Sequence, residues 1–433
     1  MPSLPPRHLL SKSTFVRGCQ CVKSLWLYKN HFKLRDQPTM QQERIFMQGT
    51  DVGLLARQLF GNGVDASPTD VFHYRESVSN TAKYIAQGHT VIFEAAFQYE
   101  GILCAVDILI KHKDKWYVYE VKSSTSVKPS FLQDAALQYY VITNAGLALE
   151  DVFIVHINKG YTRCGDLQLR QLFAKQSVLQ QVQDLQPVII SKAGELKLIA
   201  SQKYMPGTLT GSHCTQPYLC DFYNFCWKDK MPRELYGPEE KVVDKKKSET
   251  LANPAEYSYH FININTYRTA VPEYDGHWPY RHIPFMFSVC TASGKNEPLQ
   301  YQCFIAENTT DPCVQFVSEL IDAFQSDGVI LVAGKQFFSA RLHELQNDYP
   351  GYAEALEKII HRLKEFIVLE DEVQINDSSI KEDQLLLEDE DAAAAWYNLK
   401  LEKSNEASTK MKEEIKKYAL KKIQKMAIFT GSK

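Results

Sequence analysis

The chain has 433 residues, of which 44% are hydrophobic, enough to bury two cores of ordinary domain size. Its formal net charge of −3 excludes a nucleic-acid binder that works through overall positive charge, so any such surface has to be local. No run of residues has the length and apolar character of a secretory signal or a membrane span, and we therefore expect a cytoplasmic protein with no membrane partner.

Three segments that resemble β-strands carry one acid each. Glu94 lies in VIFEAAF, Asp107 in ILCAVDIL and Glu120 in KWYVYEV, and the two intervals between the acids are equal. Apolar and alternating runs of this kind predict sheet strands. A carboxylate on such a strand is costly unless it binds something. Lys122 shares a strand face with Glu120, while Val121 is expected to turn into the core.

Carboxylates on neighbouring strands offer paired oxygen donors, which Mg²⁺ and Mn²⁺ prefer. A metal there polarises a phosphate and lowers the pKa of a bound water, and a nearby Lys122 ammonium orients that water or stabilises developing charge. Residues 130–142 predict a helix with Asp134 and Gln138 one turn apart, so we expect Gln138 to face the acids. The alternative is a solvated sheet edge with ordinary charged residues.

The five polar residues of this set resemble, in their order, the PD-(D/E)xK restriction-endonuclease-like fold and specifically its RecB-like nuclease branch: Glu94, Asp107, Glu120, Lys122 and Gln138. The resemblance implies that Asp107 and Glu120 bind the metal, that Lys122 is the catalytic lysine and that Gln138 positions the site or the DNA. One departure concerns residues 49–60, which lack the metal-binding histidine often found on an early helix of this branch.

Three of the ten cysteines fall close together, as Cys214-x5-Cys220-x5-Cys226. A fourth soft ligand has to come from elsewhere, and the candidate is Cys21, with Cys19 as its competitor. Four thiolates bind an iron–sulfur cluster or zinc. The five-residue spacings are wide for a zinc site, whose paired ligands are usually two to four residues apart, and they favour the larger cluster.

One early and three late cysteines resemble the arrangement in RecB-like nucleases of the CRISPR-adaptation and helicase–nuclease kinds, where a 4Fe–4S cluster joins the ends of the domain. The resemblance implies that Cys21, Cys214, Cys220 and Cys226 hold such a cluster, with zinc as the alternative. The scattered cysteines are predicted to be small apolar core residues: Cys104, Cys164, Cys290, Cys303 and Cys313.

The polar, proline- and lysine-containing residues 231–256 predict a linker between two domains, residues 1–230 and 257–433. The hydrophobic pattern of the second domain predicts an α/β fold. Its expected elements are strands at 259–266, 284–291, 301–306 and 328–333, and helices at 312–324, 339–345 and 392–426.

The order of these elements resembles the RNase-H-like 3′–5′ exonucleases that follow the RecB-like module in an uncharacterised bacterial family. That resemblance implies a second metal site built from four acids, but the matching positions are Asn263, Asn265, Phe338 and Lys422. Amide oxygens bind Mg²⁺ weakly, phenylalanine has no lone pair, and a lysine takes the place of the cation. We therefore expect a pseudo-exonuclease domain that binds nucleic acid or a protein partner.

Together these features predict a Mg²⁺- or Mn²⁺-dependent DNA nuclease with a 4Fe–4S cluster and an inactive RNase-H-like domain, acting in DNA repair or defence. The competing interpretation is a nucleic-acid-binding or scaffold protein without catalysis, and a third is a regulator stabilised by zinc. Residues 400–433 hold ten lysines and four glutamates. This final segment is either a helix that follows a phosphate backbone or an ordinary solvated surface.

Overall fold

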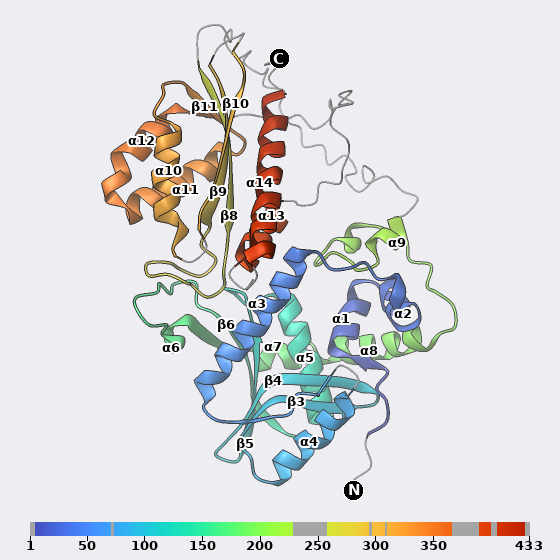
Figure 1. Cartoon of the computed structure of the whole chain (residues 1–433). Helices are drawn as coiled ribbons and strands as arrows, with labels where there is room; N and C mark the ends of the chain where they lie inside the picture. Colours follow the sequence, from blue (N-terminus) through green and yellow to red (C-terminus); the bar gives the residue numbers. More distant parts are fainter. Residues whose placement is uncertain are drawn as a thin grey trace. The chain divides into compact units, whose positions relative to one another are not determined.

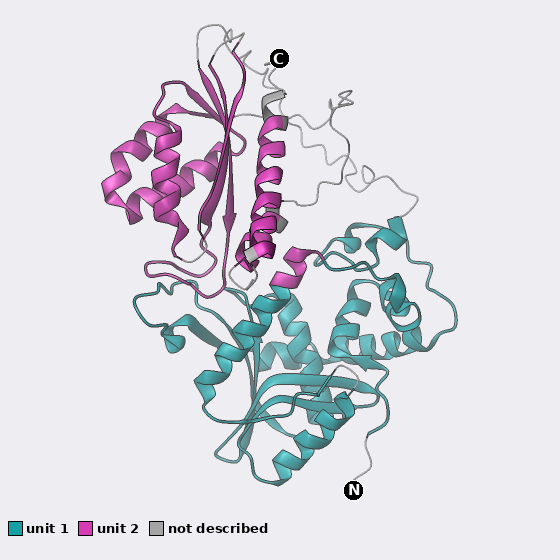
Figure 2. Cartoon of the chain, viewed as in Figure 1, with its two compact units in different colours: residues 1–38, 45–241 teal, residues 39–44, 242–433 magenta. Residues whose placement is uncertain are grey.

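The structure is a computed structural model and describes residues 5–70, 73–227, 258–293, 297–307, 310–365, 389–399 and 405–428. The chain forms two compact units, each with its own sheet (Figures 1 and 2). Unit 1 comprises Met1–Pro38 and Ile45–Lys241, and unit 2 comprises Thr39–Arg44 and Val242–Lys433. The predicted linker, residues 231–256, lies outside the described residues. Helices accompany both mixed sheets, so the expected α/β class is confirmed.

Unit 1 is built on a mixed sheet in the order β2-β3-β4-β5-β6-β7, with β1 paired to β4. The strands are β1 (Leu10–Ser11), β2 (Val64–Asp65), β3 (Val91–Tyr99), β4 (Ile102–His112), β5 (Lys115–Lys122), β6 (Leu149–Ile157) and β7 (Phe173–Ser177). The α-helices are α1 (Lys12–Gln20), α2 (Val22–Asn30), α3 (Met40–Arg57), whose first residues belong to unit 2, α4 (Tyr74–Ala86), α5 (Pro129–Asn144), α6 (Leu169–Leu172), α7 (Leu179–Asp184), α8 (Gln186–Ser201) and α9 (Tyr223–Trp227).

The core of unit 1 lies between the sheet and helices α1, α5 and α8. β4 is largely buried on both faces, as its apolar run predicts for a central strand. β5 alternates, and its inward set is Trp116, Val118 and Glu120. The prediction that Val121 turns into the core was therefore wrong: Glu120 is only 2% exposed, whereas Val121 is half-buried. Trp116 and Val118 are buried on this face of β5, and the Glu120 carboxylate lies on the same face.

Unit 2 has a five-stranded sheet in the order β10-β9-β8-β11-β12. β8, β9 and β10 pair antiparallel, whereas β11 is parallel to both β8 and β12. The strands are β8 (Tyr259–Tyr267), β9 (Ile283–Ala292), β10 (Gln300–Ile305), β11 (Val329–Val332) and β12 (Leu363–Glu365). Helices α10 (Pro312–Ala323), α11 (Lys335–Asp348) and α12 (Ala353–Arg362) lie on one face of the sheet, and α13 (Asp389–Asn398) and α14 (Asn405–Ile428) lie on the other (Figure 1).

The single helix expected at 392–426 is instead two helices, α13 (Asp389–Asn398) and α14 (Asn405–Ile428). Leu399 follows α13 in a turn, and residues 400–404 lie outside the described residues. The burial patterns explain the separation. α13 is buried along a continuous run from Ala392 to Trp396, whereas α14 buries a single stripe at helical spacing: Ile415, Tyr418, Ala419 and Ile423.

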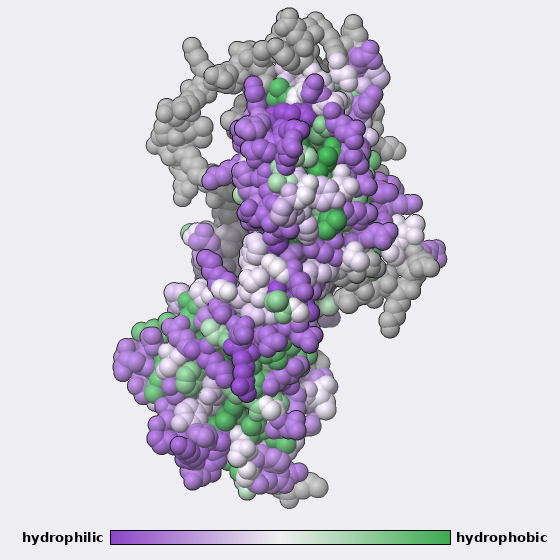
Figure 3. Space-filling view, turned by 90° about the vertical axis from the view of Figure 1, so that its left-hand side faces the viewer, coloured by the Kyte–Doolittle hydropathy of each residue, from purple (hydrophilic) through white to green (hydrophobic). Residues whose placement is uncertain are grey.

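Figure 3 shows hydrophilic residues over most of the visible described face, with hydrophobic residues in scattered patches. Within the described ranges, no helix is both long and apolar enough to cross a membrane.

Candidate functional site

The antiparallel strands β3, β4 and β5 bring the three predicted acids into one row. Regular pairs flank Glu94 and Asp107 on either side, so these two residues lie opposite each other on β3 and β4. The β4–β5 register, continued one step beyond its last pair, places Glu120 opposite Asp107. The acids are equally spaced in the sequence because each of the two successive hairpins brings the chain back to the same level of the sheet after the same number of residues.

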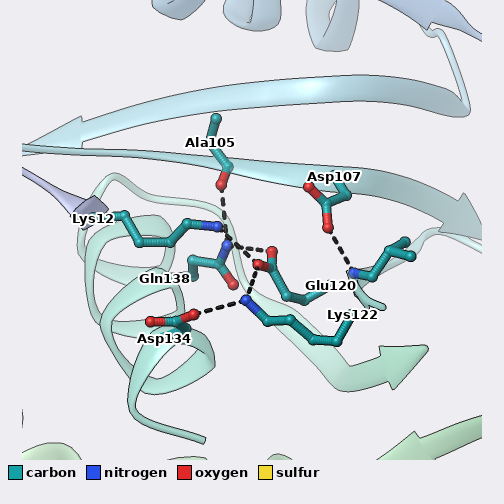
Figure 4. A network of polar contacts seen from close by, with 8 residues as sticks. Lys12, Ala105, Asp107, Glu120, Lys122, Asp134 and Gln138 are labelled. Carbon is teal, nitrogen blue, oxygen red and sulfur yellow. Dashed lines mark hydrogen bonds and ion pairs between the residues drawn. The ribbon is translucent and has the colours of Figure 1, made fainter. Parts of the chain in front are cut away.

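Glu120 is the centre of a buried charge network (Figure 4). Its Oε1 accepts a hydrogen bond from Lys12 Nζ at 2.8 Å and lies 2.9 Å from Lys122 Nζ. Its Oε2 accepts a hydrogen bond from Gln138 Nε2 at 2.6 Å. Burial alone would raise the pKa of Glu120, but Lys12, Lys122 and Gln138 outweigh burial and lower it, so the carboxylate stays charged.

Gln138 comes from α5 and is fully buried. Its Nε2 also donates to the carbonyl oxygen of Ala105 at 3.0 Å, which fixes the amide between β4 and β5. Its Oε1 is buried and has no hydrogen-bond partner, so a free acceptor remains beside the acids. The prediction that Gln138 faces the acids holds in its geometry.

Asp107 is held less firmly than Glu120. Its Oδ2 accepts a hydrogen bond from the Val121 N–H at 2.6 Å. Burial and the neighbouring charge of Glu120 raise the pKa of Asp107 to about 7, and Lys12 offsets only part of this effect. A carboxyl with a raised pKa beside another carboxylate signals negative charge that lacks compensation, and a cation would supply it.

Glu94 has a backbone φ of +51°, in the left-handed region that is unfavourable for this residue type. Strained backbone of this kind persists where the surroundings impose it, often at functional sites. Burial raises the pKa of Glu94, although Arg57 Nη2 contacts Oε1 at 2.8 Å. Arg57 also pairs with Asp65 at 2.7 Å. It lies on α3, the early helix that lacks the histidine, and sequence reasoning did not identify it.

Lys122 is clamped between two acids. Its Nζ lies 2.9 Å from Glu120 Oε1 and 2.7 Å from Asp134 Oδ2, and its side chain is 17% exposed. Burial alone would lower the pKa of Lys122, but the two carboxylates outweigh it and raise the pKa. The ammonium therefore stays charged. Asp134 and Gln138 are one turn apart on α5, so a single helix face holds both the lysine and the glutamate.

Lys12 is a second site residue that the sequence did not indicate. The two-residue strand β1 pairs in parallel with β4, and α1 begins immediately after β1. This brings the Lys12 ammonium onto Glu120, a residue 108 positions away. Burial alone would lower the pKa of Lys12, but the nearby acids outweigh it and raise the pKa. A two-residue strand has no periodicity, so no local pattern could have predicted this contact.

The donor set suits a hard divalent cation. Four carboxylates face three cationic groups: Glu94, Asp107, Glu120 and Asp134 against Lys12, Arg57 and Lys122. The excess charge is negative and oxygen donors predominate, as Mg²⁺ and Mn²⁺ require. Lys12 contacts the Glu120 oxygen from a position that is 27% exposed.

The structure gathers four cysteines around one pocket in unit 1. Cys21, at the junction of α1 and α2, lines it together with Cys214, Cys220 and Cys226. Cys19 is exposed and is not among the lining residues. Of the two early cysteines, the structure therefore places Cys21 with the later three.

Polar contacts hold the two cysteine-bearing segments together. The Arg17 guanidinium donates two hydrogen bonds to the Asp221 carboxylate, at 2.9 and 2.8 Å. Gln20 Nε2 donates to the carbonyl oxygens of His213 and Tyr218. A small apolar cluster of Trp26, Leu27 and Phe222 lies beside these contacts. The convergence of the cysteines thus rests on contacts that do not need a metal.

The spacing of the four thiols differs from that of a single zinc ion. Thiolates on one tetrahedral zinc, each at about 2.3 Å, lie roughly 3.8 Å apart. Among the described residues, these cysteines do not form a group of three with sulfur atoms within 4.8 Å of one another. Electrostatic repulsion from the other three cysteines adds to burial in raising the pKa of Cys226. The four side chains are therefore close enough to interact electrostatically. The wider spacing suits a cluster of several metal atoms.

The remaining cysteines divide by burial. Cys104, Cys290 and Cys313 are buried, as predicted for small apolar core residues, and Cys303 is half-buried. The prediction was wrong for Cys164, which is exposed in the loop that follows β6. A scattered cysteine has no sequence neighbours that fix its side of the chain, so burial has to come from the fold.

The four positions of the second expected metal site hold two asparagines, a phenylalanine and a lysine. Asn263 and Asn265 lie on β8, where the Asn263 amide donates to Asn265 Oδ1 at 2.9 Å. Phe338 is buried in the core of unit 2, and Lys422 lies on α14. The two amides therefore use part of their hydrogen-bonding capacity on each other, and Phe338 serves packing.

Comparison with known families gives a match for unit 2. A family model described as "Domain of unknown function (DUF2779)" matches residues 260–379. No curated protein matches the chain. The matched segment begins in β8, so the acid and lysine site and the cysteine pocket both lie outside it.

Proposed function

We propose that unit 1 is a metal-dependent nuclease of RecB-like PD-(D/E)xK type that hydrolyses phosphodiester bonds in DNA. The observation that carries this proposal is the buried carboxylate of Glu120 on β5, which Lys122 and Gln138 contact while Asp107 lies opposite it on β4. Burying several charges is costly, and an apolar cluster of the same volume would stabilise the fold as well or better. A role in catalysis would explain why these charged residues are buried in spite of the unfavourable free energy.

In this proposal Asp107 and Glu120 bind Mg²⁺ or Mn²⁺, with Glu94 close to the same row. The bound ion supplies Lewis acidity and a water of lowered pKa. Lys122, kept charged by Glu120 and Asp134, stabilises negative charge that grows on the phosphate. Gln138 fixes the orientation of Glu120, and its unpaired Oε1 would be available to accept a hydrogen bond from a bound water.

Cys21, Cys214, Cys220 and Cys226 hold a 4Fe–4S cluster in this proposal, with zinc as the alternative. Their common pocket and their wide spacing support the cluster. Its place between α1–α2 and the segment after α8 supports a structural role, because it joins the start of unit 1 to its end. α1 also carries Lys12, so the cluster stabilises one wall of the proposed active site.

Unit 2 is, in this proposal, an RNase-H-like pseudo-exonuclease that binds nucleic acid or a protein partner. Its sheet, three antiparallel strands extended by two parallel ones, supports that fold. The lack of an acid at Asn263, Asn265, Phe338 and Lys422 supports the loss of metal-dependent chemistry.

One observation favours the alternative of a nucleic-acid-binding or scaffold protein without catalysis. Lys12 and Lys122 both contact Glu120 Oε1, so the carboxylate is neutralised without a metal. The deciding experiment incubates the full-length protein with labelled single- and double-stranded DNA, and with RNA, in Mn²⁺ and in Mg²⁺. Cleavage of DNA that stops on chelation is expected. Binding without cleavage in every metal would establish the alternative.

Metal affinity is expected to depend on pH through Asp107. Its raised pKa means that the carboxyl carries a proton below about pH 7, and a protonated carboxyl does not bind Mn²⁺. The affinity for Mn²⁺ should therefore fall by about tenfold per unit as the pH drops below that pKa, with release of one proton per ion. Titration calorimetry in two buffers of different ionisation enthalpy measures this release, and binding without it would contradict the assignment of Asp107.

DNA affinity is expected to depend on salt through α14. Lys416, Lys417 and Lys421 are exposed on this helix. If they bind phosphates, their replacement by alanine lowers the slope of log affinity against log salt by about one unit for each phosphate that the variant no longer binds. Lys358→Ala, on α12 and paired with Glu354, is the matched control and should leave the slope unchanged. An equal slope in all variants would make α14 an ordinary solvated surface.

A further inference from the structure

Unit 2 contains a buried polar cluster that has no part in the proposed nuclease site. His277 lies in the loop between β8 and β9, Asp311 is the N-cap of α10, and Cys313 is in the first turn of that helix. Their potential ligand atoms all lie within 4.8 Å of one another, a property found for this group alone among the described residues. All three residues fall in the segment that matches the family model.

The imidazole of His277 lacks the partners that a buried polar group needs. The residue is 2% exposed, and neither ring nitrogen makes a hydrogen bond. Nε2 lies 3.3 Å from Asp311 Oδ2, but the two atoms do not meet the geometry of a hydrogen bond. Buried polar side chains are nearly always satisfied, so a buried imidazole that makes no hydrogen bond, and whose Nε2 lies beside the Asp311 carboxylate, indicates a ligand.

The separation of these atoms agrees with zinc coordination. Nitrogen and oxygen ligands bind zinc at about 2.0–2.2 Å, and in a tetrahedral arrangement they lie roughly 3.3–3.5 Å apart. His277 Nε2 and Asp311 Oδ2, at 3.3 Å, already have that spacing. We propose that His277, Asp311 and Cys313 bind one Zn²⁺ ion, with a water as the fourth ligand.

The chemistry of the three ligands favours zinc over the hard cations of unit 1. A thiolate, an imidazole and a carboxylate form a mixed set that suits zinc, whereas Mg²⁺ requires oxygen donors. When the ion binds, the Cys313 thiol gives its proton to solvent and the sulfur bonds to zinc. The thiolate and the carboxylate then neutralise the ion. Arg281, the nearby cation, is paired with Asp348 and adds no net charge.

Two surrounding hydrogen bonds orient the Asp311 carboxylate. The Tyr349 hydroxyl donates to Asp311 Oδ2 at 2.9 Å, and the Cys313 N–H donates to Oδ1 at 3.0 Å. Outer partners of this kind hold metal-binding carboxylates in place. Tyr349 follows α11, so an ion bound here joins the β8–β9 loop to α10 and, through this tyrosine, to α11. The site is therefore a structural cross-link within unit 2.

The test measures zinc in the full-length protein. Wild type is expected to carry one more equivalent of zinc than Cys313→Ser, by mass spectrometric metal analysis of reduced, anaerobically purified protein. Cys290→Ser, which changes a buried cysteine of the same unit outside the cluster, should keep the wild-type amount. Tyr349→Phe should keep the stoichiometry but weaken zinc affinity by about 10-fold or more. Equal zinc in wild type and Cys313→Ser would overturn the proposal.

A measurement on the wild type alone guards against a variant that fails to fold. X-ray absorption at the zinc edge should show one sulfur and three nitrogen or oxygen ligands around each ion. Four sulfur ligands would place the zinc at the cysteine pocket of unit 1 and overturn the assignment to unit 2. Protein that takes up no zinc when supplied with it under reducing conditions would overturn it as well.

Discussion

Replacing Asp107 by asparagine is expected to lower metal-dependent DNA cleavage by about 10²-fold or more in the full-length protein. Asparagine keeps the shape of the side chain but offers a neutral oxygen, which binds Mg²⁺ or Mn²⁺ more weakly. The hydrogen bond from the Val121 N–H can still form. The loss should therefore concern metal binding and chemistry. Initial rates on labelled DNA measure it across a series of Mn²⁺ concentrations.

The same substitution is expected to stabilise the metal-free fold. Folding raises the pKa of Asp107 to about 7, so the folded protein holds this proton more tightly than the unfolded chain. The stability contributed by such a group is present at low pH and is lost as the pH rises to the folded pKa. Asparagine does not titrate, so the variant should melt about 2–5 °C higher at about pH 8 without metal. A lower melting temperature together with lost cleavage would point to a structural role instead.

Matched variants separate the site from general effects of charge. Asp114→Asn changes an exposed acid after β4, and Lys115→Ala changes an exposed lysine on β5 that pairs with Glu150. Both should cleave as the wild type does. Lys122→Ala should lose activity to an extent similar to Asp107→Asn, because it removes the charged donor of the same site. Full activity in both Asp107→Asn and Lys122→Ala would disprove the assignment of the active site.

Cys220→Ala is expected to abolish the iron–sulfur chromophore and to lower the melting temperature of unit 1 by about 10 °C or more. A metal centre that forms only in the folded state contributes its binding free energy to folding. Cys220 lies in the pocket with Cys21, so its loss removes the contribution of the metal centre to the connection between the two cysteine-bearing segments of unit 1. Visible absorption, iron content and a calorimetric scan of anaerobically purified protein measure the effect.

Cys19→Ala and Cys164→Ala are the controls for this prediction, since both change exposed cysteines outside the pocket. They should keep the colour, the iron content and the melting temperature of the wild type. Colourless wild-type protein that carries stoichiometric zinc bound by four sulfurs would show that this site binds zinc and not an iron–sulfur cluster. Iron-containing Cys220→Ala protein with unchanged stability would refute both versions of the site.

The local pattern of the sequence determined the strands and the acids that they carry. Strand periodicity needs only neighbouring residues, so the hairpins that bring Glu94, Asp107 and Glu120 into register could be predicted from their equal spacing. Helix periodicity likewise placed Gln138 toward the acids. The same reasoning identified the α/β class of both units and the cysteine trio.

Only the tertiary structure decided how the buried charges are paired and which faces are inward. Lys12 meets Glu120 across 108 positions, through a strand of two residues, and Arg57 reaches Glu94 from a separate helix. The inward face of β5, the division into α13 and α14 and the approach of His277 to Asp311 also depend on packing between distant segments. Periodicity determines which residues share a face, but the partner of that face is set by the fold, because burial and electrostatic compensation are properties of the whole unit.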